Sequence, residues 1–341
     1  MSQRRLIAFE LDVLCARNLW GNPEQSEAMT EVSIIIASYN TRDFTLQCLN
    51  SIYDNVKSLS FEVICIDNNS QDGSPALIRE KFPEVILIKN EENLGYAKAN
   101  NLGISRSVGQ YVVLLNSDTV VMPGSLEHVI EFMRSHPDAG AASPKLLNPD
   151  GTLQYCIRTL PSISTAIFQS LRWHVLFPGN RITEKYYKMT LNYDDVLSVD
   201  SIGTTCYAIR RHVLDDIGFL DERFIMYNVD LDLNKRIKDA GYNVYFLPEA
   251  RVIHYGGVSV NQNSYRGLIE QHQGMWRMYK KHYAGKRSRI INYFIFLVIK
   301  LRLFVYLLRA FCIKDKRVVK GPGASKKQYK VQGSANVEKL F

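Results

Sequence analysis

The chain has 341 residues, of which 46% are hydrophobic, and this size and composition suit one large globular domain, alone or with an appendage. Its net charge of +8 is unevenly spread: residues 284–341 carry fourteen Lys or Arg and two acids, a net charge of +12, so that residues 1–283 carry −4. The six cysteines show no paired spacing. This excludes a disulfide framework and a zinc site as organising features and favours a reducing compartment.

Residues 1–28 are expected to form an extension outside the core fold, although their apolar residues could also pack as a short helix or strand. The basic pair Arg4 and Arg5 is followed by Glu10 and Asp12, which interrupt the apolar stretch that a signal peptide needs. We therefore expect no secretion signal.

Strands and helices are predicted to alternate from residue 32 onward. Apolar runs predict strands at 32–37, 61–66, 85–88 and 111–115, and the last of these is expected to be buried. Helical spacing predicts helices from about Phe44 and at 75–82, 96–107 and 123–136. Asn40 or Thr41 would cap the first of these helices, and Pro123 would open the last. Such alternation is typical of βαβ units with a parallel sheet.

The second half of the chain is less regular. In residues 145–200 only a helix at about 164–176 is predicted. A helix at about 230–240 should end at Gly241, followed by a strand at 243–247 and by a closing segment at 251–257.

Two carboxylates are predicted at one edge of the sheet. Asp67 ends the second strand, and Asp118 follows the fourth strand through Asn116 and Ser117. Ligands of open α/β sheets bind at the carboxyl ends of the strands, so this edge would suit a metal or a phosphate. Ordinary turn chemistry would also explain an Asn-Ser-Asp sequence.

Three further candidates lie near the end of the predicted domain. Asp230 and Asp232 open a helix, where acids also serve simply to complement the helix dipole. His254 precedes Gly256 and Gly257, which permit a close approach of backbone to a ligand, although a lone histidine is more often structural. Asp118 with His254 would suit Mn²⁺ or Mg²⁺, with phosphate oxygens and water completing the shell.

Six co-linear segments between residues 32 and 257 resemble the family-2 glycosyltransferases of GT-A fold, especially their bacterial rhamnosyltransferase-like branch. The matching segments are 32–40, 67–74, 93–97 with Asn100 and Asn101, 114–121, 219–224 and 240–242. The fold class implied is α/β, a Rossmann-like and mostly parallel central sheet flanked by helices.

The resemblance implies roles for these residues. Asp230 matches the catalytic base, with Asp232 as the fallback, and Asp118 and His254 match the metal-side residues of an inverting, metal-dependent transfer. The residues expected to bind the nucleotide-sugar are Ser38, Tyr39, Asn40, Asp67, Asn69, Asn93, Gly95, Asn100, Asn116 and Ser117. The donor would be a dTDP- or UDP-type nucleotide-sugar, with a rhamnose-like deoxyhexose favoured and a UDP-hexose as the alternative.

Two positions depart from the family pattern. Asn116 stands in place of the first acid of the D-x-D-like motif, and this branch of the family often has Asn at that position. Val229 stands where the family commonly has Glu directly before the base. This second departure keeps open the alternative of a non-catalytic, membrane-bound scaffold with a decayed site.

A C-terminal apolar segment at 290–313 carries Lys300, Arg302 and Arg309 and has basic residues on both sides. Charges within the segment favour a basic amphipathic helix on an anionic membrane surface over a transmembrane span. A helix packed on the protein body is a third possibility. Nucleic acid is not expected as a partner, because the apolar content is too high for a phosphate-binding tail.

The expected organisation has four parts. Residues 1–28 form the extension, 29–265 the GT-A domain, 266–315 the helical membrane-associating segment, and 316–341 a basic flexible tail. The expected acceptor is a lipid-linked glycan or polysaccharide, and the expected location is the cytoplasmic face of the inner membrane, with peripheral attachment.

Overall fold

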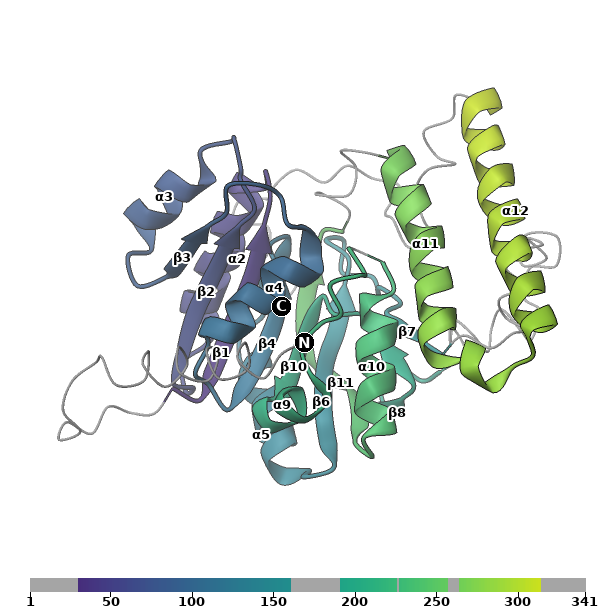
Figure 1. Ribbon diagram of the computed structural model, residues 1–341. Coiled ribbons are helices and arrows are strands. Elements are labelled where there is room, and N and C mark those ends of the chain that lie inside the picture. The colour runs from purple at the N-terminus through teal and green to yellow at the C-terminus, as the bar shows by residue number, and fades with distance from the viewer. Residues whose placement is uncertain (1–29, 161–190, 226, 257–263, 314–341) are drawn as a thin grey trace, which may run out of the picture.

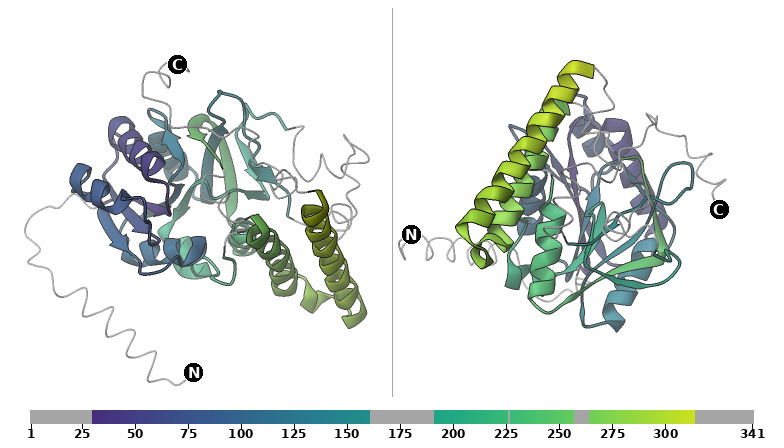
Figure 2. Two further views of the ribbon diagram at one scale, coloured as in Figure 1. Left: turned by 90° about the horizontal axis from the view of Figure 1, so that it is seen from above. Right: turned by 90° about the vertical axis from the view of Figure 1, so that its right-hand side faces the viewer.

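The structure, a computed structural model, describes residues 30–160, 191–225, 227–256 and 264–313. The predicted N-terminal extension, the helix expected at 164–176 and the basic tail at 316–341 lie outside the described residues. One nine-stranded sheet forms the centre of the molecule, and helices cover both of its faces (Figures 1 and 2).

The first half of the sheet is parallel and follows the prediction closely. Its order is β3 (Ile86–Lys89), β2 (Phe61–Asp67), β1 (Val32–Ser38) and β4 (Tyr111–Asn116). Strands β1 and β4 are almost wholly buried, as expected for apolar runs covered by helices on both sides. Their carboxyl ends therefore meet at one edge.

The second half of the sheet mixes strand directions, so the sheet is less parallel than the sequence suggests. The order continues from β4 with β10 (Cys206–Arg210), β6 (Ala139–Leu147), β11 (Asn243–His254) and β5 (Thr119–Val121). Strand β10 runs antiparallel to both neighbours, while β6 and β11 are parallel. Strand β8 (Leu197–Val199) pairs antiparallel with β11, and β7 (Ile157–Arg158) with β9 (Ser201–Ile202) forms a small separate sheet.

The helices of the domain lie between these strands in the chain. They are α2 (Arg42–Asn55), α3 (Ser74–Lys81), α4 (Gly95–Arg106), α5 (Ser125–Ser135), α9 (Arg211–Ile217) and α10 (Val229–Asp239). The predicted end of α10 is confirmed, since Gly241 follows the C-cap with φ 90°.

One of the two predicted helix starts needs correction. Helix α5 begins at Ser125 after the N-cap Gly124, so Pro123 lies outside the helix and not at its first position. The chain first makes a turn there, in which Ser125 N donates to Met122 O at 3.1 Å. The predicted start of α2 is confirmed, since Thr41 is its N-cap, although the Thr41 side chain makes no capping hydrogen bond.

The C-terminal part forms a helical hairpin beside the domain, and its two helices stand side by side in Figures 1 and 2. Helix α11 (Ser264–His282) and helix α12 (Arg289–Ile313) are joined through a short 3₁₀ turn at Ala284–Lys286. Tyr279, Ile295 and Ile299 bury the seam between them. Residues Arg289–Leu308 are long and apolar enough to cross a membrane, yet only 11% of the most apolar window is buried. Helix α12 therefore packs on the protein body along this seam only, and most of its apolar surface stays exposed.

Candidate active site

The carboxyl ends of β1, β2 and β4 bring predicted site residues to one edge of the sheet. Ser38 lies opposite Asp67 in the β1–β2 register, and Ala37 lies opposite Asn116 in the β1–β4 register. Asp118 follows two residues after Asn116. The structure thus places the two strand-end carboxylates on the same edge, as the strand pattern predicts.

Asp67 has a carboxylate oxygen that none of the described protein groups satisfies. The residue is 0% exposed, and its Oδ2 accepts a hydrogen bond from Ser70 N at 3.1 Å. Its Oδ1 is buried without a hydrogen-bond partner among the described residues. Buried polar atoms are nearly always paired, and leaving one unpaired is costly. Asp67 Oδ1 is therefore suited to accept a hydrogen bond from a ligand.

The loops after β1 and β2 are tied to each other beside Asp67. Asn40 N donates to Ser70 Oγ at 2.9 Å, and Gln71 N donates to Asn40 Oδ1 at 2.8 Å. Asn40 and Asn69 both have positive φ, 49° and 65°, a conformation that asparagine tolerates better than most residues. Asn40 and Asn69 therefore shape the loop, and Tyr39 lies half-buried next to them.

Ser38 and Ser117 belong to a buried cluster of hydroxyl groups. Ser38 Oγ lies 3.1 Å from Thr41 Oγ1 and 2.9 Å from Thr45 Oγ1, and Ser117 Oγ lies 3.0 Å from Thr41 Oγ1. These bonds fasten the turn that carries Asp118 to the loop after β1. The two serine side chains thus stabilise this edge of the sheet.

Asn93, Gly95 and Asn100 shape the start of α4. Asn93 Oδ1 accepts a hydrogen bond from Gly95 N at 2.9 Å, and Asn100 Nδ2 donates to Tyr96 O at 2.8 Å. Gly95 has φ 78°, and a Cβ there would lie 3.0 Å from Ile225 Cγ2. These side-chain hydrogen bonds of Asn93 and Asn100 are local, while Gly95 O also accepts a hydrogen bond from Asn68 Nδ2 at 3.5 Å in the loop after β2.

Asp118 and His254 meet across the sheet edge, with Nε2 of the histidine 3.3 Å from Oδ1 of the aspartate. His254 Nδ1 donates to Gln154 Oε1 at 2.6 Å. The orientation of the Gln154 amide is fixed, because its Nε2 donates to Asn148 Oδ1 at 3.0 Å and to His254 O at 3.3 Å. Strands β11 and β5 pair here, which explains why residues so distant in sequence converge.

This arrangement fits a divalent cation. Because Nδ1 donates to Gln154, Nε2 is the ring nitrogen that faces the carboxylate of Asp118 and would bind the metal. Metal-bound histidines usually donate their second ring N–H in this way. Among the described residues no group of three or more His, Cys, Asp or Glu gathers to hold a metal. The protein would therefore supply two ligands and leave positions for phosphate oxygens and water.

Asp230 lies in the first turn of α10, which is connected to the same edge through the loop at 202–205: Asn234 Nδ2 donates both to Asp230 O at 2.6 Å and to Ile202 O at 2.9 Å. Asn116 N donates to Thr205 O at 2.8 Å, and Tyr96 Oη donates to Thr204 O at 3.0 Å. Burial raises the pKa of Tyr96, and the nearby charge of Asp230 raises it further. Asp230 is half-exposed, and within the described part of the chain no group donates a hydrogen bond to its carboxylate. This carboxylate is available to take a proton.

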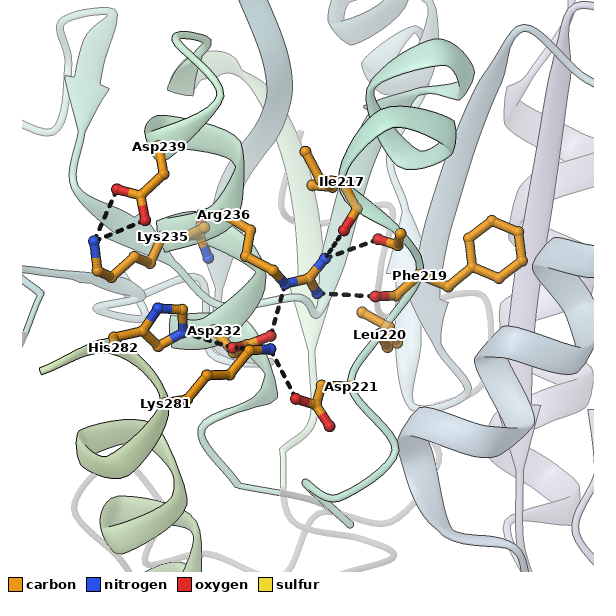
Figure 3. A network of polar contacts seen from close by, with 12 residues as sticks. Ile217, Phe219, Leu220, Asp221, Asp232, Lys235, Arg236, Asp239, Lys281 and His282 are labelled. Carbon is orange, nitrogen blue, oxygen red and sulfur yellow. Dashed lines mark hydrogen bonds and ion pairs between the residues drawn. The ribbon is translucent and has the colours of Figure 1, made fainter. Parts of the chain in front are cut away.

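Asp232 has a different environment, shown in Figure 3. It is 0% exposed and contacts three cationic or histidine side chains: Arg236 Nε at 2.8 Å, Lys281 Nζ at 2.7 Å and His282 Nε2 at 2.7 Å. Burial acts to raise the pKa of Asp232, but these contacts outweigh it and lower that pKa below its ordinary value. A buried carboxylate held by three partners is a poor base, so the fallback role expected of Asp232 is not supported.

The sequence profile described as "Glycosyl transferase family 2" matches residues 33–218, more than half of the chain. The chain belongs to glycosyl transferase family 2. It is a glycosyltransferase, and the resemblance found in the sequence is confirmed.

Relatives of this family-2 glycosyltransferase include an N-acetylglucosaminyl-diphospho-decaprenol L-rhamnosyltransferase of Mycobacterium tuberculosis, 28% identical over 63% of this chain and 76% of that protein. An O-antigen biosynthesis protein of Myxococcus xanthus is 24% identical over 67% of this chain, which spans 18% of that protein. The comparisons fit the rhamnosyltransferase-like branch.

Solved structures share the fold. A mannosyltransferase from Pyrobaculum calidifontis, in complex with GDP-Man and Mn²⁺, superposes with a TM-score of 0.53 at 16% identity, covering 92% of this chain and 81% of that one. S. aureus TarS 1-349 gives a TM-score of 0.51 at 16% identity, covering 83% and 75%. At these identities the likeness shows the GT-A fold.

Two features of the glycosyltransferase site were missed by sequence reasoning. Gln154 orients His254 from 100 positions away, and Lys281 with His282 contacts Asp232 from about 50 positions away. No local pattern marks these residues, because their partners become neighbours only in the folded sheet and hairpin.

Proposed function

We propose that this glycosyltransferase moves a rhamnose-like deoxyhexose from a dTDP-type nucleotide-sugar to a lipid-linked glycan, with inversion at the anomeric carbon. The half-exposed carboxylate of Asp230, with no hydrogen bond from the described residues, is the observation that carries the mechanism. The Mycobacterium tuberculosis relative, named for rhamnosyl transfer to a diphospho-decaprenol, supports the substrate class.

Each group of site residues has a separate role in this proposal. Asp67 Oδ1, buried and unsatisfied by the described residues, accepts a hydrogen bond from the nucleoside part of the donor. Asp118 and His254 would hold a divalent metal, which would neutralise the charge of the leaving diphosphate. Asp230 takes the proton from the acceptor hydroxyl as that hydroxyl attacks the face opposite the leaving group. The mannosyltransferase of the same fold was solved with Mn²⁺ bound, which supports a metal of this type.

Val229 does not weaken the assignment of an enzyme. Its side chain is 3% exposed and belongs to the hydrophobic core, whereas Asp230 beside it is half-exposed. A carboxylate at position 229 would be buried in that core. The departure from the family pattern is therefore a difference in packing, and the decayed-scaffold alternative loses its main argument.

The surface of α12 supports attachment to a membrane. Most of its exposed apolar side chains share one face, and Ile291 is exposed beside that face. The residues of this face are Ile290, Tyr293, Phe294, Leu297, Leu301, Phe304, Val305 and Leu308. Lys300 and Arg302 belong to the same helix, and basic residues precede it. A helix of this kind lies in the interface of an anionic leaflet, which here would be the cytoplasmic one.

The proposal is tested by presenting the purified chain and Mn²⁺ with dTDP-L-rhamnose or UDP-glucose, and with N-acetylglucosaminyl diphosphoryl polyprenol in anionic vesicles as acceptor. We expect metal-dependent formation of a rhamnosyl product of inverted configuration, observed by mass spectrometry and NMR. Transfer from UDP-glucose alone would establish the alternative donor. A product of retained configuration would contradict the single displacement at Asp230.

A further inference from the structure

Helix α11 contacts the catalytic helix α10 on the side away from Asp230. Asp230 and Asp232 are two positions apart, so they lie on different faces of α10. Asp232 faces the end of α11, where Lys281 Nζ and His282 Nε2 each lie 2.7 Å from its Oδ1. Figure 3 shows both side chains reaching Asp232 from the hairpin.

The contact is reinforced on either side of Asp232. Lys281 Nζ also lies 2.7 Å from Asp221 Oδ2, in the loop before α10. Arg236, which holds the second oxygen of Asp232, donates to the backbone oxygens of Ile217, Gly218 and Phe219. The carboxylate of Asp232 therefore joins α10, the loop before it and the end of α11 in one network.

A second, independent contact lies before Asp230. Asn228 is the N-cap of α10, and its Nδ2 donates to Gln271 O on α11 at 3.4 Å. Helix α11 comes so close here that a Cβ on Gly274 would lie 2.6 Å from Asn228 Nδ2 and 3.0 Å from Tyr227 O. Helix α11 thus touches α10 two residues before Asp230 and two residues after it.

We propose that Lys281 and His282 are positioning residues, which hold Asp232 and thereby set the place of Asp230 against the acceptor. This inference rests on the proposed role of Asp230 as the base. The two contacts bracket Asp230 and fix the first turn of α10 to the hairpin, while the Asp230 carboxylate receives no hydrogen bond from the described residues on the other face. The hairpin, whose apolar face is proposed to bind a membrane, is thereby connected through Asp232 to the helix that carries the proposed base.

The first test compares Lys281→Met and His282→Leu with Lys280→Met as the matched control. Lys280 is exposed, lies on the same helix and makes no ion pair with the described residues. A displacement of about 1 Å can lower a rate by about 100-fold. We expect kcat for transfer from dTDP-L-rhamnose to N-acetylglucosaminyl diphosphoryl polyprenol to fall about 10- to 100-fold in the two variants, with the donor KM unchanged. Lys281→Arg and His282→Gln, which retain a donor group, should recover much of that loss.

The second test asks whether Lys281 acts through Asp230. If it does, Lys281→Met should lower kcat strongly in the native background but little further in an Asp230→Asn background, since the two changes remove one function. Equal losses in both backgrounds would contradict the proposal, because they would indicate a general loss of folded enzyme. Unchanged kcat in the native background would contradict it as well.

A third measurement does not require turnover. Amide hydrogen exchange over residues 229–233 should be faster in Lys281→Met than in the native chain, and unchanged in Lys280→Met. Equal exchange rates in the native chain and both variants would show that Lys281 does not hold the first turn of α10. This result does not depend on the identity of the donor or the acceptor. If Asp230→Asn proves fully active while exchange responds as expected, the proposed base is wrong and the contact between the helices stands.

Discussion

Single polar atoms distinguish ligand-binding residues from structural ones at the sheet edge. Ser38 and Ser117 are satisfied within the hydroxyl cluster, and the side chain of Asn100 bonds within its own helix. Asp67 keeps one buried oxygen unpaired among the described residues. The sequence places Asp67 correctly at a strand end but cannot say which atoms the loop after it leaves unsatisfied, because that depends on contacts made by neighbouring loops.

The unpaired oxygen of Asp67 leads to a prediction about donor binding. The substitution Asp67→Asn removes the negative charge that would strengthen a hydrogen bond from the nucleotide. Hydrogen bonds to charged groups contribute about 1.5–3 kcal/mol. Isothermal titration with dTDP should show a dissociation constant about 10- to 100-fold higher. Asp43→Asn serves as the control, since Asp43 is exposed and pairs only with Arg42 among the described residues. Equal affinity for dTDP in the native chain and in Asp67→Asn would show that Asp67 only shapes the loop.

The hydrogen bond from His254 to Gln154 leads to a second prediction. Removing the acceptor in Gln154→Leu frees the imidazole to rotate and to exchange its tautomer, and losing such a partner lowers metal affinity by about 10- to 100-fold. Titration of Mn²⁺ in the presence of dTDP, followed by electron paramagnetic resonance, measures this. Gln154→Glu keeps an acceptor and should bind Mn²⁺ more tightly than Gln154→Leu. If both variants bind Mn²⁺ like the native chain, His254 does not contact the metal.

At the scale of elements, the sequence predicts what is locally encoded. Strands β1, β2 and β4 are predicted because each contains a run of apolar residues, most of which are buried. Strand β10 is not foreseen as an antiparallel insertion between β4 and β6, because its direction is decided by pairing with distant strands. The predicted start of α5 is wrong for a related reason. Pro123 suits the first position of a helix, but a turn places it before the helix.

The network around Asp232 makes a prediction about stability and pH. Because the pKa of Asp232 is lowered in the folded protein, its stabilising contribution is present above the ordinary aspartate value and is lost as pH falls below it. Breaking a buried ion pair costs about 3–5 kcal/mol, so Asp232→Asn should lower the free energy of unfolding by about that amount at pH 7.

Urea unfolding at a series of pH values measures this effect. The difference between Asp232→Asn and the native chain should shrink as the pH falls below about 4. Asp239→Asn removes an ion pair on the same helix whose carboxylate is exposed, and it should cost less than about 1 kcal/mol. A difference that stays constant down to a pH of about 2, well below the ordinary aspartate pKa, would show that charge is not what makes Asp232 stabilising.

For the whole molecule, the hairpin and the domain present two different surfaces. The body of residues 1–283 is mildly acidic, while the C-terminal segment is strongly basic and carries the apolar face of α12. Peripheral attachment and a membrane span are distinguishable by experiment. The length and hydropathy of α12 suit a span, whereas its internal charges suit an interfacial position.

Membrane attachment can be measured by flotation with vesicles. We expect the chain to float with vesicles containing phosphatidylserine and to stay in solution with purely zwitterionic ones. Lys300→Glu should weaken binding by about fivefold or more, since each basic residue contributes about 1 kcal/mol at an anionic surface. Washing native membranes at alkaline pH should release a peripheral protein. Retention of the chain after that wash would establish a transmembrane span instead.

The assignment of Asp230 as the base is central to the proposed mechanism, and one kinetic comparison tests it most directly. A positioned general base contributes about 10²- to 10⁴-fold to the rate. The measurement is kcat of Asp230→Asn in transfer from dTDP-L-rhamnose to N-acetylglucosaminyl diphosphoryl polyprenol, with dTDP and Mn²⁺ affinities determined on the same preparation. We predict a fall of kcat within that range while both affinities stay near those of the native chain. Full turnover by Asp230→Asn would contradict the assignment.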